Sequence, residues 1–385
     1  MSSEWPSRSL GEFVRLQRGH DLTAAEQREG GIPVMGSAGP NGTHSEALAK
    51  GPGVVIGRSG GSIGRVHFSE VAFWPHNTCL YVTDFLGNNP RFAYYLLQTL
   101  NLAGYNSGSA QPSLNRNFIY AIRIQVPARR EQDEVAHLLH SFDERIALLR
   151  ETNATLEAIA QALFKSWFVD FDPVRAKSQG LTPVGMEEAI AAHFPSAFDA
   201  TTATSCPVGW RAGRVEDLLE LAYGKALKAT DRVAGDVPVY GSGGLTGYHN
   251  EPLISGPSVI VGRKGTIGSL NWEDRPSFPI DTVFYLRPKV PLTFCFYQLQ
   301  VLGLSQMNTD GAVPGLNRNN VYRLPVVIPT PAVLGAFDEV VGALRRRVFA
   351  NERQAQNLAG LRDTLLPRLI SGRLSHVTVE ADLAA

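Results

Sequence analysis

The chain has 385 residues and a mass of 41.8 kDa, enough for two or three domains rather than one compact unit. Its 36 Lys and Arg residues balance its 36 Asp and Glu residues, which argues against a protein that binds nucleic acid mainly through bulk positive charge. Apolar residues make up 44% and charged residues 19%, so the composition is that of a folded protein rather than a disordered one.

The cellular setting follows from what the sequence lacks. No apolar run approaches the ~18 residues of a membrane span, and the first residues lack the features of a secretory signal. The three cysteines, Cys79, Cys206 and Cys295, lie far apart, which favours reduced thiols over a disulfide framework or a metal site. We therefore expect a cytoplasmic protein without a membrane partner.

The sequence contains an internal repeat. The segment IPVMGSAGPNGTH at 32–44 recurs as VPVYGSGGLTGYH at 237–249, which is 205 residues later. PSLNRNFIYAIRIQVP at 112–127 recurs as PGLNRNNVYRLPVVIP at 314–329, which is 202 residues later. The small drift in offset indicates loop deletions, so we infer one ancestral half that was duplicated.

The first domain, residues 1–128, is rich in Gly and Pro and contains short apolar runs between turn residues. Runs of this kind predict short strands of an irregular, mostly-β domain. A brief helix is predicted at 91–103, where apolar residues recur at helical spacing. The second domain, residues 207–330, repeats this texture.

A long amphipathic helix is predicted after each domain, at 129–170 and at 331–373. Its apolar residues recur in steps of 4 and 3, the 3.5-residue period of a coiled coil. An ordinary surface helix packed on its own domain is the alternative, but about 38 residues make a rod of ~55 Å, longer than a small domain covers. The predicted seam comprises Phe142, Ile146, Leu149, Asn153, Leu156, Leu163 and Trp167, with Phe337, Val341, Leu344, Val348, Asn351 and Leu358.

The seam also predicts a register. An antiparallel pair with Asn153 opposite Asn351 lets the two amides satisfy each other and penalises slipped registers. It would place the two β domains at opposite ends of the rod. Aligning Phe142 with Phe337 gives an offset of only 195, so we expect the second helix to start one heptad late. The remaining pairs would be Ile146 with Leu358, Leu156 with Val348, Leu163 with Val341, and Trp167 with Phe337.

Residues 171–206 are predicted to be a polar, Pro-punctuated linker with one short helix around 186–193. The tail, 374–385, is expected to fray after Gly372. The fold class is thus α+β: two mostly-β domains in a pseudo-two-fold tandem repeat, separated by two long helices that form an antiparallel coiled coil.

Familiar catalytic motifs are missing. The sequence has no Walker phosphate loop, GxGxxG, HExxH or CxxC, and no Asp/Asn-Pro-Pro-aromatic tetrad of amino-methyltransferases. His137 and His140 lie near Asp133 and Glu134 at helical spacing and could bind a metal, although a solvated helix face is the favoured interpretation. The Gly-rich segment 57–61 could cradle a phosphate, but such hairpins are common. A duplicated recognition module, with no catalytic, metal or cofactor site of its own, fits better than an enzyme.

A long ligand that repeats along its axis suits two copies of one module, and duplex DNA is the obvious candidate. Residues 5–128 carry 10 Lys and Arg against 7 Asp and Glu, and residues 207–330 carry 12 against 10. Because this excess is small, contacts to base edges and a partner's basic surface must contribute much of the binding.

The chain resembles the specificity subunits of type I restriction-modification systems over essentially its whole length. The resemblance rests on the duplicated order of domain and long helix, the VPVYGSGG-type loop, the Leu-Asn-Arg-Asn segments 114–117 and 316–319, and the stretch ALFKSWFVDFDP at 162–173. It implies two target-recognition domains that each read one half of a split asymmetric site in double-stranded DNA, with the helices setting the gap.

The resemblance also implies partners. Two modification subunits would carry S-adenosylmethionine and methylate adenine N6, and restriction subunits would carry ATP with Mg and the translocation and cleavage activities. The chain itself would catalyse nothing and hold no cofactor. A protein-interaction scaffold that bridges two partners without reading DNA is the alternative, and a single-chain restriction enzyme with unrecognised chemistry is a third.

Polar residues in equivalent loops of the two halves are the candidates for DNA contact, since arginine can bind guanine O6 and N7 and amide side chains can bind adenine N6 and N7. Asp281 and Asn77 have a structural alternative, capping or turn hydrogen bonds. Residues that both halves keep, Ser37/Ser242, Asn115/Asn317 and Arg116/Arg318, are assigned to structural or phosphate contacts. The DNA-binding candidates are Arg58, Ser59, Arg65, His76, Asn77, Gln111 and Arg116 in the first half and Arg263, Lys264, Asn271, Asp281, Thr282 and Arg318 in the second.

Overall fold

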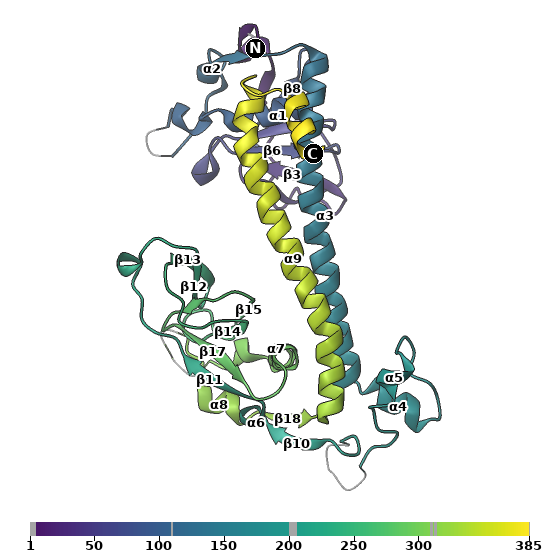
Figure 1. Cartoon of the computed structure of the whole chain (residues 1–385). Helices are drawn as coiled ribbons and strands as arrows, with labels where there is room; N and C mark the ends of the chain where they lie inside the picture. Colours follow the sequence, from purple (N-terminus) through teal and green to yellow (C-terminus); the bar gives the residue numbers. More distant parts are fainter. Residues whose placement is uncertain (1–4, 109–110, 200–205, 309–310, 312–313, 385) are drawn as a thin grey trace. The chain divides into compact units, whose positions relative to one another are not determined.

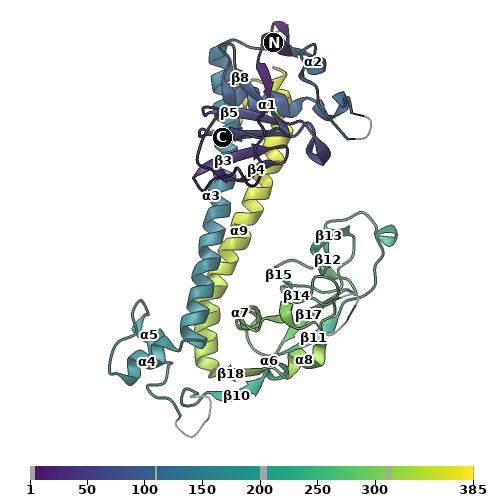
Figure 2. The same ribbon diagram turned by 180° about the vertical axis from the view of Figure 1, so that it is seen from behind.

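The structure is a computed structural model that describes residues 5–108, 111–199, 206–308, 311 and 314–384. The chain divides into two compact units (Figures 1 and 2). Unit 1 comprises Met1–Leu149 and Gln354–Ala385, and unit 2 comprises Arg150–Arg353. Each unit therefore contains one Gly/Pro-rich domain together with a segment of both long helices.

The domain of unit 1 is built from three small sheets. A four-stranded antiparallel sheet has the order β2-β8-β5-β6, a three-stranded sheet has the order β4-β3-β7, and β1 pairs with β9. The elements are β1 (Ser7–Ser9), β2 (Arg15–Arg18), β3 (Ile32–Gly36), β4 (Gly39–His44), β5 (Gly53–Gly57), β6 (Val66–Ser69), β7 (Trp74–Pro75), β8 (Cys79–Asp84), α1 (Pro90–Thr99), α2 (Arg116–Ile119) and β9 (Arg123–Gln125), with 3-10 turns at Leu10–Glu12, Gly60–Ser62 and Leu102–Tyr105.

The domain of unit 2 has the same topology. Its sheets have the orders β11-β17-β14-β15, β13-β12-β16 and β10-β18, so the duplication seen in the sequence is a duplication of structure. The elements are β10 (Arg211–Arg214), α6 (Val215–Leu218), β11 (Leu219–Tyr223), β12 (Val237–Gly241), β13 (Gly244–His249), β14 (Ser258–Gly262), β15 (Leu270–Glu273), β16 (Phe278–Pro279), β17 (Val283–Pro288), α7 (Leu292–Val301), α8 (Arg318–Tyr322) and β18 (Pro325–Ile328), with 3-10 turns at Ala229–Asp231 and Leu304–Gln306.

The apolar runs of the sequence form the central strands. All five residues of β5 and of β14 are buried, as expected for strands covered on both faces. Gly19 and its repeat Gly224 mark a close backbone approach, because a Cβ atom there would lie 2.0 Å from the carbonyl oxygen of His76 or of Ile280. The repeated glycines therefore bring the end of β2 or β11 against the segment between the two larger sheets.

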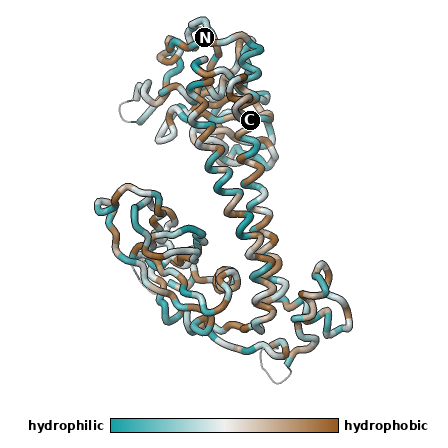
Figure 3. Tube along the Cα trace, viewed as in Figure 1, coloured by the Kyte–Doolittle hydropathy of each residue, from teal (hydrophilic) through white to brown (hydrophobic). Residues whose placement is uncertain are grey.

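The two long helices, α3 (Arg129–Phe168) and α9 (Pro331–Ile370), have 40 residues each. They start at positions 202 residues apart, the same offset as the preceding strands, so the prediction that the second helix starts one heptad late is wrong. The apolar pattern repeats every seven residues, and a shift of one heptad aligns it equally well. Figure 3 shows hydrophobic and hydrophilic residues alternating along both helices, as an amphipathic helix requires.

The two helices pack against each other in both units, and the antiparallel pair is confirmed. In unit 2, Asn351 donates through Nδ2 to Oδ1 of Asn153 over 2.9 Å, and the rings of Trp167 and Phe337 lie 5.7 Å apart. In unit 1, Ile146 and Leu149 form a buried cluster with Ala355, against which Leu358 packs. Of the other seam residues, Phe142 lies in the core of unit 1, and Leu163, Val341 and Leu344 lie in or against the core of unit 2. Leu156 and Val348 are half-buried.

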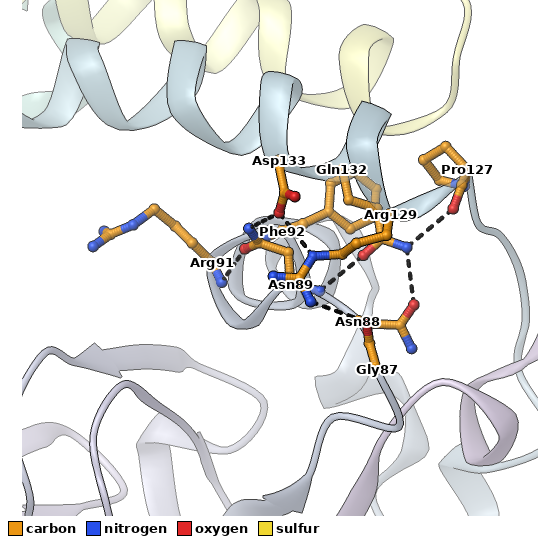
Figure 4. A network of polar contacts seen from close by, with 9 residues as sticks. All are labelled: Gly87, Asn88, Asn89, Arg91, Phe92, Pro127, Arg129, Gln132 and Asp133. Carbon is orange, nitrogen blue, oxygen red and sulfur yellow. Dashed lines mark hydrogen bonds and ion pairs between the residues drawn. The ribbon is translucent and has the colours of Figure 1, made fainter.

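A buried polar network joins the start of α3 to the start of α1 (Figure 4). Gln132, 2% exposed, donates to Oδ1 of Asn88 and to the carbonyl oxygen of Pro127, and accepts from the backbone N–H of Asn89. The Asn89 side chain caps α1 by accepting the N–H groups of Arg91 and Phe92. The network thus fixes where α3 leaves the domain.

Two predictions outside the domains need correction. The linker contains α5 (Glu188–Ala191), close to the expected helix, but also α4 (Asp172–Ser178), which begins with Pro173 in its first turn. The tail was expected to fray after Gly372. It forms α10 (His376–Ala384), whose Val379 is buried in the core of unit 1 and whose His376 contacts Glu134 at 3.2 Å. Its apolar residues give it an anchor.

Candidate nucleic-acid interface

Three loops are joined by backbone hydrogen bonds in the domain of unit 1. The backbone N–H groups of Arg58 and Ser59, which follow β5, donate to the carbonyl oxygen of Thr78 over 2.9 and 3.2 Å. The N–H of Leu114, before α2, donates to the carbonyl oxygen of Arg58 over 2.8 Å. These bonds hold the three loops in one fixed arrangement.

Unit 2 repeats the arrangement bond for bond. The N–H groups of Arg263 and Lys264 donate to the carbonyl oxygen of Thr282 over 3.0 and 3.1 Å, and the N–H of Leu316 donates to that of Arg263 over 2.8 Å. Two copies of one loop scaffold therefore present side chains that differ between the units.

Each scaffold forms a polar cleft. The cleft of unit 1 has a volume of about 690 Å³, and three of its lining side chains are arginines against one aspartate. It is lined by Gln17, Arg18, Gly19, His20, Asp21, Arg58, Leu80, Ser107, Ser113, Leu114, Asn115 and Arg116. An open cleft with excess positive charge suits a polyanion rather than an apolar ligand.

The cleft of unit 2 is smaller, about 260 Å³, and more aromatic. The guanidinium groups of Arg263 and Arg318 lie 5.4 and 4.9 Å from the centre of the Tyr223 ring, which is 52% exposed. Two cations on one partly exposed ring offer donors and an aromatic face together. The lining residues are Tyr223, Arg263, Phe284, Leu316, Asn317, Arg318 and Asn319.

The shared arginines are held in place by backbone carbonyl groups. Arg58 donates through Nε to the carbonyl oxygen of Asn77 over 3.3 Å, and Arg263 donates likewise to that of Asp281 over 3.2 Å. Arg116 donates through Nη1 to the carbonyl oxygen of Leu16 over 2.8 Å. A guanidinium group has five donors, so such anchors orient it while leaving capacity for a ligand.

The equivalent Arg318 donates to the carbonyl oxygen of Leu221 over 3.4 Å. Its buried Nε has no hydrogen-bond partner among the described residues. Arg116 and Arg318 therefore each tie their helix, α2 or α8, to strand β2 or β11.

The structure brings four of the predicted residues into the clefts: Arg58 and Arg116 in unit 1, and Arg263 and Arg318 in unit 2. Ser59 directly follows Arg58 in the sequence, and Lys264 directly follows Arg263. Asn77 donates through its amide to the carboxylate of Asp21, and His76 contacts the hydroxyl of Thr78 at 3.0 Å. The carbonyl groups of Asp281 and Thr282 belong to the loop scaffold.

The last six predicted residues just described lie outside the lining of the clefts, and so do three further predicted residues. Arg65 and Gln111 are exposed on neighbouring loops. Asn271 lies on β15, next to the turn at Gly244. The shared Asn115 and Asn317 cap α2 and α8 by accepting the N–H groups of Asn117 and Asn319, while Ser37 donates to the carbonyl oxygen of Ser59 over 2.7 Å.

Sequence reasoning missed Arg18, His20, Asp21 and Tyr223. A signal was present, because these residues flank Gly19 or Gly224, which the repeat had already paired. The residues next to a shared glycine differ between the halves: Arg18 corresponds to Tyr223 and Asp21 to Ala226. Comparing the halves position by position around each shared glycine would have found them.

The cysteine beside the cleft of unit 1 is not a reactive group. Burial raises the pKa of the Cys79 thiol to about 12, against the opposing influence of Arg58, so this cysteine beside the cleft stays protonated and unreactive. No group of three or more His, Cys, Asp or Glu residues that could hold a metal ion is found among the described residues. No described helix is long and apolar enough to cross a membrane.

A duplicated domain with an arginine-lined cleft in each copy is typical of a protein that recognises a ligand. The protein-family model of the type I restriction modification DNA specificity domain matches residues 2–158 and 207–332 of the chain. The chain therefore belongs to this protein family. The expected resemblance is thereby confirmed.

Individual relatives agree with the family. The HindI specificity subunit of Haemophilus influenzae is 24% identical over 356 residues, which covers 74% of this chain and 77% of the relative. The MjaIX specificity subunit of Methanocaldococcus jannaschii is 24% identical over 314 residues, covering 74% and 68%. The crystal structure of the type I S subunit from M. genitalium has the same fold, with a TM-score of 0.65, 18% identity and coverage of 95% and 96%.

Proposed function

We propose that the chain selects the DNA sequence for a type I restriction-modification complex, with each domain reading one half of a bipartite asymmetric site. Residues 1–128 and 207–330 would be the two target-recognition domains, and the helices at 129–170 and 331–373 would set the gap. One observation carries the proposal: the same loop scaffold with the same two arginines occurs in both units, surrounded by side chains that differ.

The shared and differing residues suit different tasks. Arg58 and Arg263 occupy equivalent positions, so we assign them to contacts that both half-sites have in common, phosphates above all. Asp21 in unit 1 and Tyr223 in unit 2 have no like residue in the other copy and suit contacts to base edges. A carboxylate accepts a hydrogen bond from cytosine N4, and an aromatic ring contacts a thymine methyl group.

The catalytic work would belong to partners. In this proposal two modification subunits supply S-adenosylmethionine and adenine methylation, and restriction subunits supply ATP-driven translocation and cleavage. Family membership supports these partners, and the near balance of charge in each domain fits a subunit that shares DNA binding with others. The chain itself would position the partners and catalyse nothing.

The gap-setting role can be tested by changing both helices together. One heptad is inserted after Leu149 in α3 and one after Arg353 in α9, where the two units divide, so that the inserted turns can pair. Seven residues add ~10.5 Å of helix, at most about three base-pair rises. The methylated motif should keep both half-site sequences and have a longer gap.

The matched control replaces only the exposed residues Arg150, Glu151, Ala154 and Thr155 with those of the inserted heptad, so the length of the helix and the seam residues Asn153 and Leu156 stay unchanged. Its gap should equal that of the parent chain. An unchanged gap in the lengthened chain would remove the gap-setting role, and the absence of any bipartite motif in the parent would remove the proposed function itself.

A further inference from the structure

The apolar seam between α3 and α9 does not define its own register. Its pattern repeats every seven residues: along α9, Leu334, Val341, Val348 and Ala355 follow one another at this spacing, so a seam residue of α3 would meet an apolar residue after a slip of one heptad as well. Apolar contacts survive a slip of one heptad, so polar contacts must decide which turns of the two helices face each other.

Unit 1 contains one such contact. Tyr95 on α1 donates its hydroxyl to Oδ2 of Asp143 on α3 over 2.5 Å, and the other carboxylate oxygen of Asp143 pairs with Arg362 on α9. Tyr95 is 1% exposed, so its hydroxyl depends on this acceptor. The cluster therefore joins the domain to both long helices.

Unit 2 contains a second cluster of the same composition. Tyr297 on α7 donates to Oε2 of Glu157 on α3 over 3.1 Å, and Arg345 on α9 donates to the same oxygen over 2.9 Å. Tyr297 is also 1% exposed, and the guanidinium group of Arg345 lies 4.7 Å from the centre of the Trp272 ring. In both clusters the acid lies on α3 and the arginine on α9.

The neighbouring heptads carry the wrong partners for Glu157. Seven residues from Arg345, in either direction along α9, stand Asp338 and Glu352. A slip of one heptad either way would thus replace an ion pair with two facing carboxylates, an unfavourable like-charge contact.

The same slip is penalised in two other places. Seven residues from Arg362 stand Ala355 and Leu369, so Asp143 would lose its cation. Seven residues from Asn351 stand Leu344 and Leu358, so Asn153 would lose its amide partner. All three polar layers therefore favour one register among the heptad alternatives.

We propose that the two tyrosine–acid–arginine clusters are positioning residues that hold α3 and α9 in a single register and, through it, hold the gap between the two half-sites to a single length. The part about the gap rests on the proposed function, whereas the part about the register does not. The clusters touch no base; they act through the helices that carry the domains.

The test reverses the charge of Glu157. In Glu157→Arg the parental register sets two cations against each other at Arg345, whereas a slip of one heptad brings Asp338 or Glu352 opposite the new arginine. Glu157→Gln is the matched neutral variant, and Glu157→Arg/Arg345→Glu restores an ion pair in the parental register. All three are made in the full-length chain.

Register is measured directly by pulsed electron paramagnetic resonance between spin labels at Ala154→Cys on α3 and Glu339→Cys on α9. Both positions are exposed and lie in unit 2, and the native cysteines are buried and escape labelling. A slip of one heptad displaces the labels along the helix axis by ~10.5 Å. Glu157→Arg should show a second distance, and the double variant should return to the single distance of the parent.

The gap is measured by mapping methylation after co-expression with the modification subunit. Glu157→Arg should add a second gap length to an unchanged pair of half-sites, and the double variant should remove it. A second label distance without a second gap would overturn the link to the gap, and absence of any bipartite motif in the parent would count against the proposed function alone.

A single, unshifted label distance in Glu157→Arg would overturn the role in register. If Glu157→Arg does not give a folded chain, the test uses Glu157→Gln, in which the distribution of distances between the two spin labels should be broader than in the parent. A distribution as narrow as that of the parent would overturn the proposal in that case too.

Discussion

The buried network around Gln132 gives the sharpest prediction about stability. Replacing Gln132 with leucine, the residue at the equivalent position Leu334, keeps the size of the side chain but removes three hydrogen bonds. Oδ1 of Asn88, the carbonyl oxygen of Pro127 and the backbone N–H of Asn89 then lose this partner. Asn88 stays fixed, because its Nδ2 also donates to the carbonyl oxygens of Phe13 and Phe85.

The expected cost follows from burial. Each buried group without a partner costs about 1–3 kcal/mol, and Gln132 and Asn88 are only 2% and 7% exposed. Water can reach part of the Asn89 end, and the leucine recovers some apolar burial, so we expect a loss of about 2–4 kcal/mol. Since ~1.4 kcal/mol corresponds to a factor of ten, this loss should raise the equilibrium constant for local opening by ~30- to 700-fold.

Hydrogen exchange with mass spectrometry, read on peptides covering α1 and the first turns of α3, measures this opening. Asp133→Ala is the matched control, because Asp133 belongs to the same network but its side chain is 48% exposed. Removal of its pair with Arg129 should cost no more than about 1 kcal/mol. Exchange in Gln132→Leu within ~3-fold of the parent, or slower than in Asp133→Ala, would refute the reasoning from burial.

Three further outcomes are expected. Asn153→Leu/Asn351→Leu should raise the melting temperature and broaden the distribution of label distances across the helices, because a polar pair in an apolar seam specifies the register but lowers stability. A lower melting temperature would contradict this. Burial raises the pKa of Cys79 from 9.0 in the unfolded chain to about 12 in the folded one, so its contribution to the free energy of unfolding is complete below pH ~9 and is lost as the pH rises towards 12. Between pH 8 and 10.5, Cys79→Val should therefore lose less stability than the parent. An equal loss in both proteins would contradict this. In methylation maps, Asp21→Ala should change only the half-site that the first domain reads, and Tyr223→Arg only the half-site that the second domain reads. A change in both half-sites from either variant would contradict the proposal that each domain reads its own half-site.

Repetition and period made most of the fold accessible from the sequence. The duplicated segments fixed the two domains, and the 3.5-residue period fixed the helix pair, including Asn153 opposite Asn351. The same period gave the wrong offset between the two helices, 195 residues in place of 202, because an apolar pattern cannot distinguish one heptad from the next. The charged residues that do so, such as Glu157 and Arg345, pair over 188 positions in the sequence and give no local signal.

The candidate site was only partly predictable. Arg58 and Arg116 were found because they lie in repeated motifs, and so were their equivalents Arg263 and Arg318. Asp21 was missed because it differs from its equivalent Ala226 and so belongs to no repeated motif, although it lies two residues from the shared Gly19. Predicting the helical tail required knowing that Val379 has a core to enter.

Methylation mapping tests the central claim most directly. The chain is co-expressed with its neighbouring modification subunit, and methylated adenines across a plasmid are located by single-molecule sequencing, with and without this chain. The account predicts one bipartite motif with a fixed gap, which disappears when the chain is omitted. Formation of a stable complex without any sequence motif would contradict it and would favour a scaffold that joins partners without reading DNA.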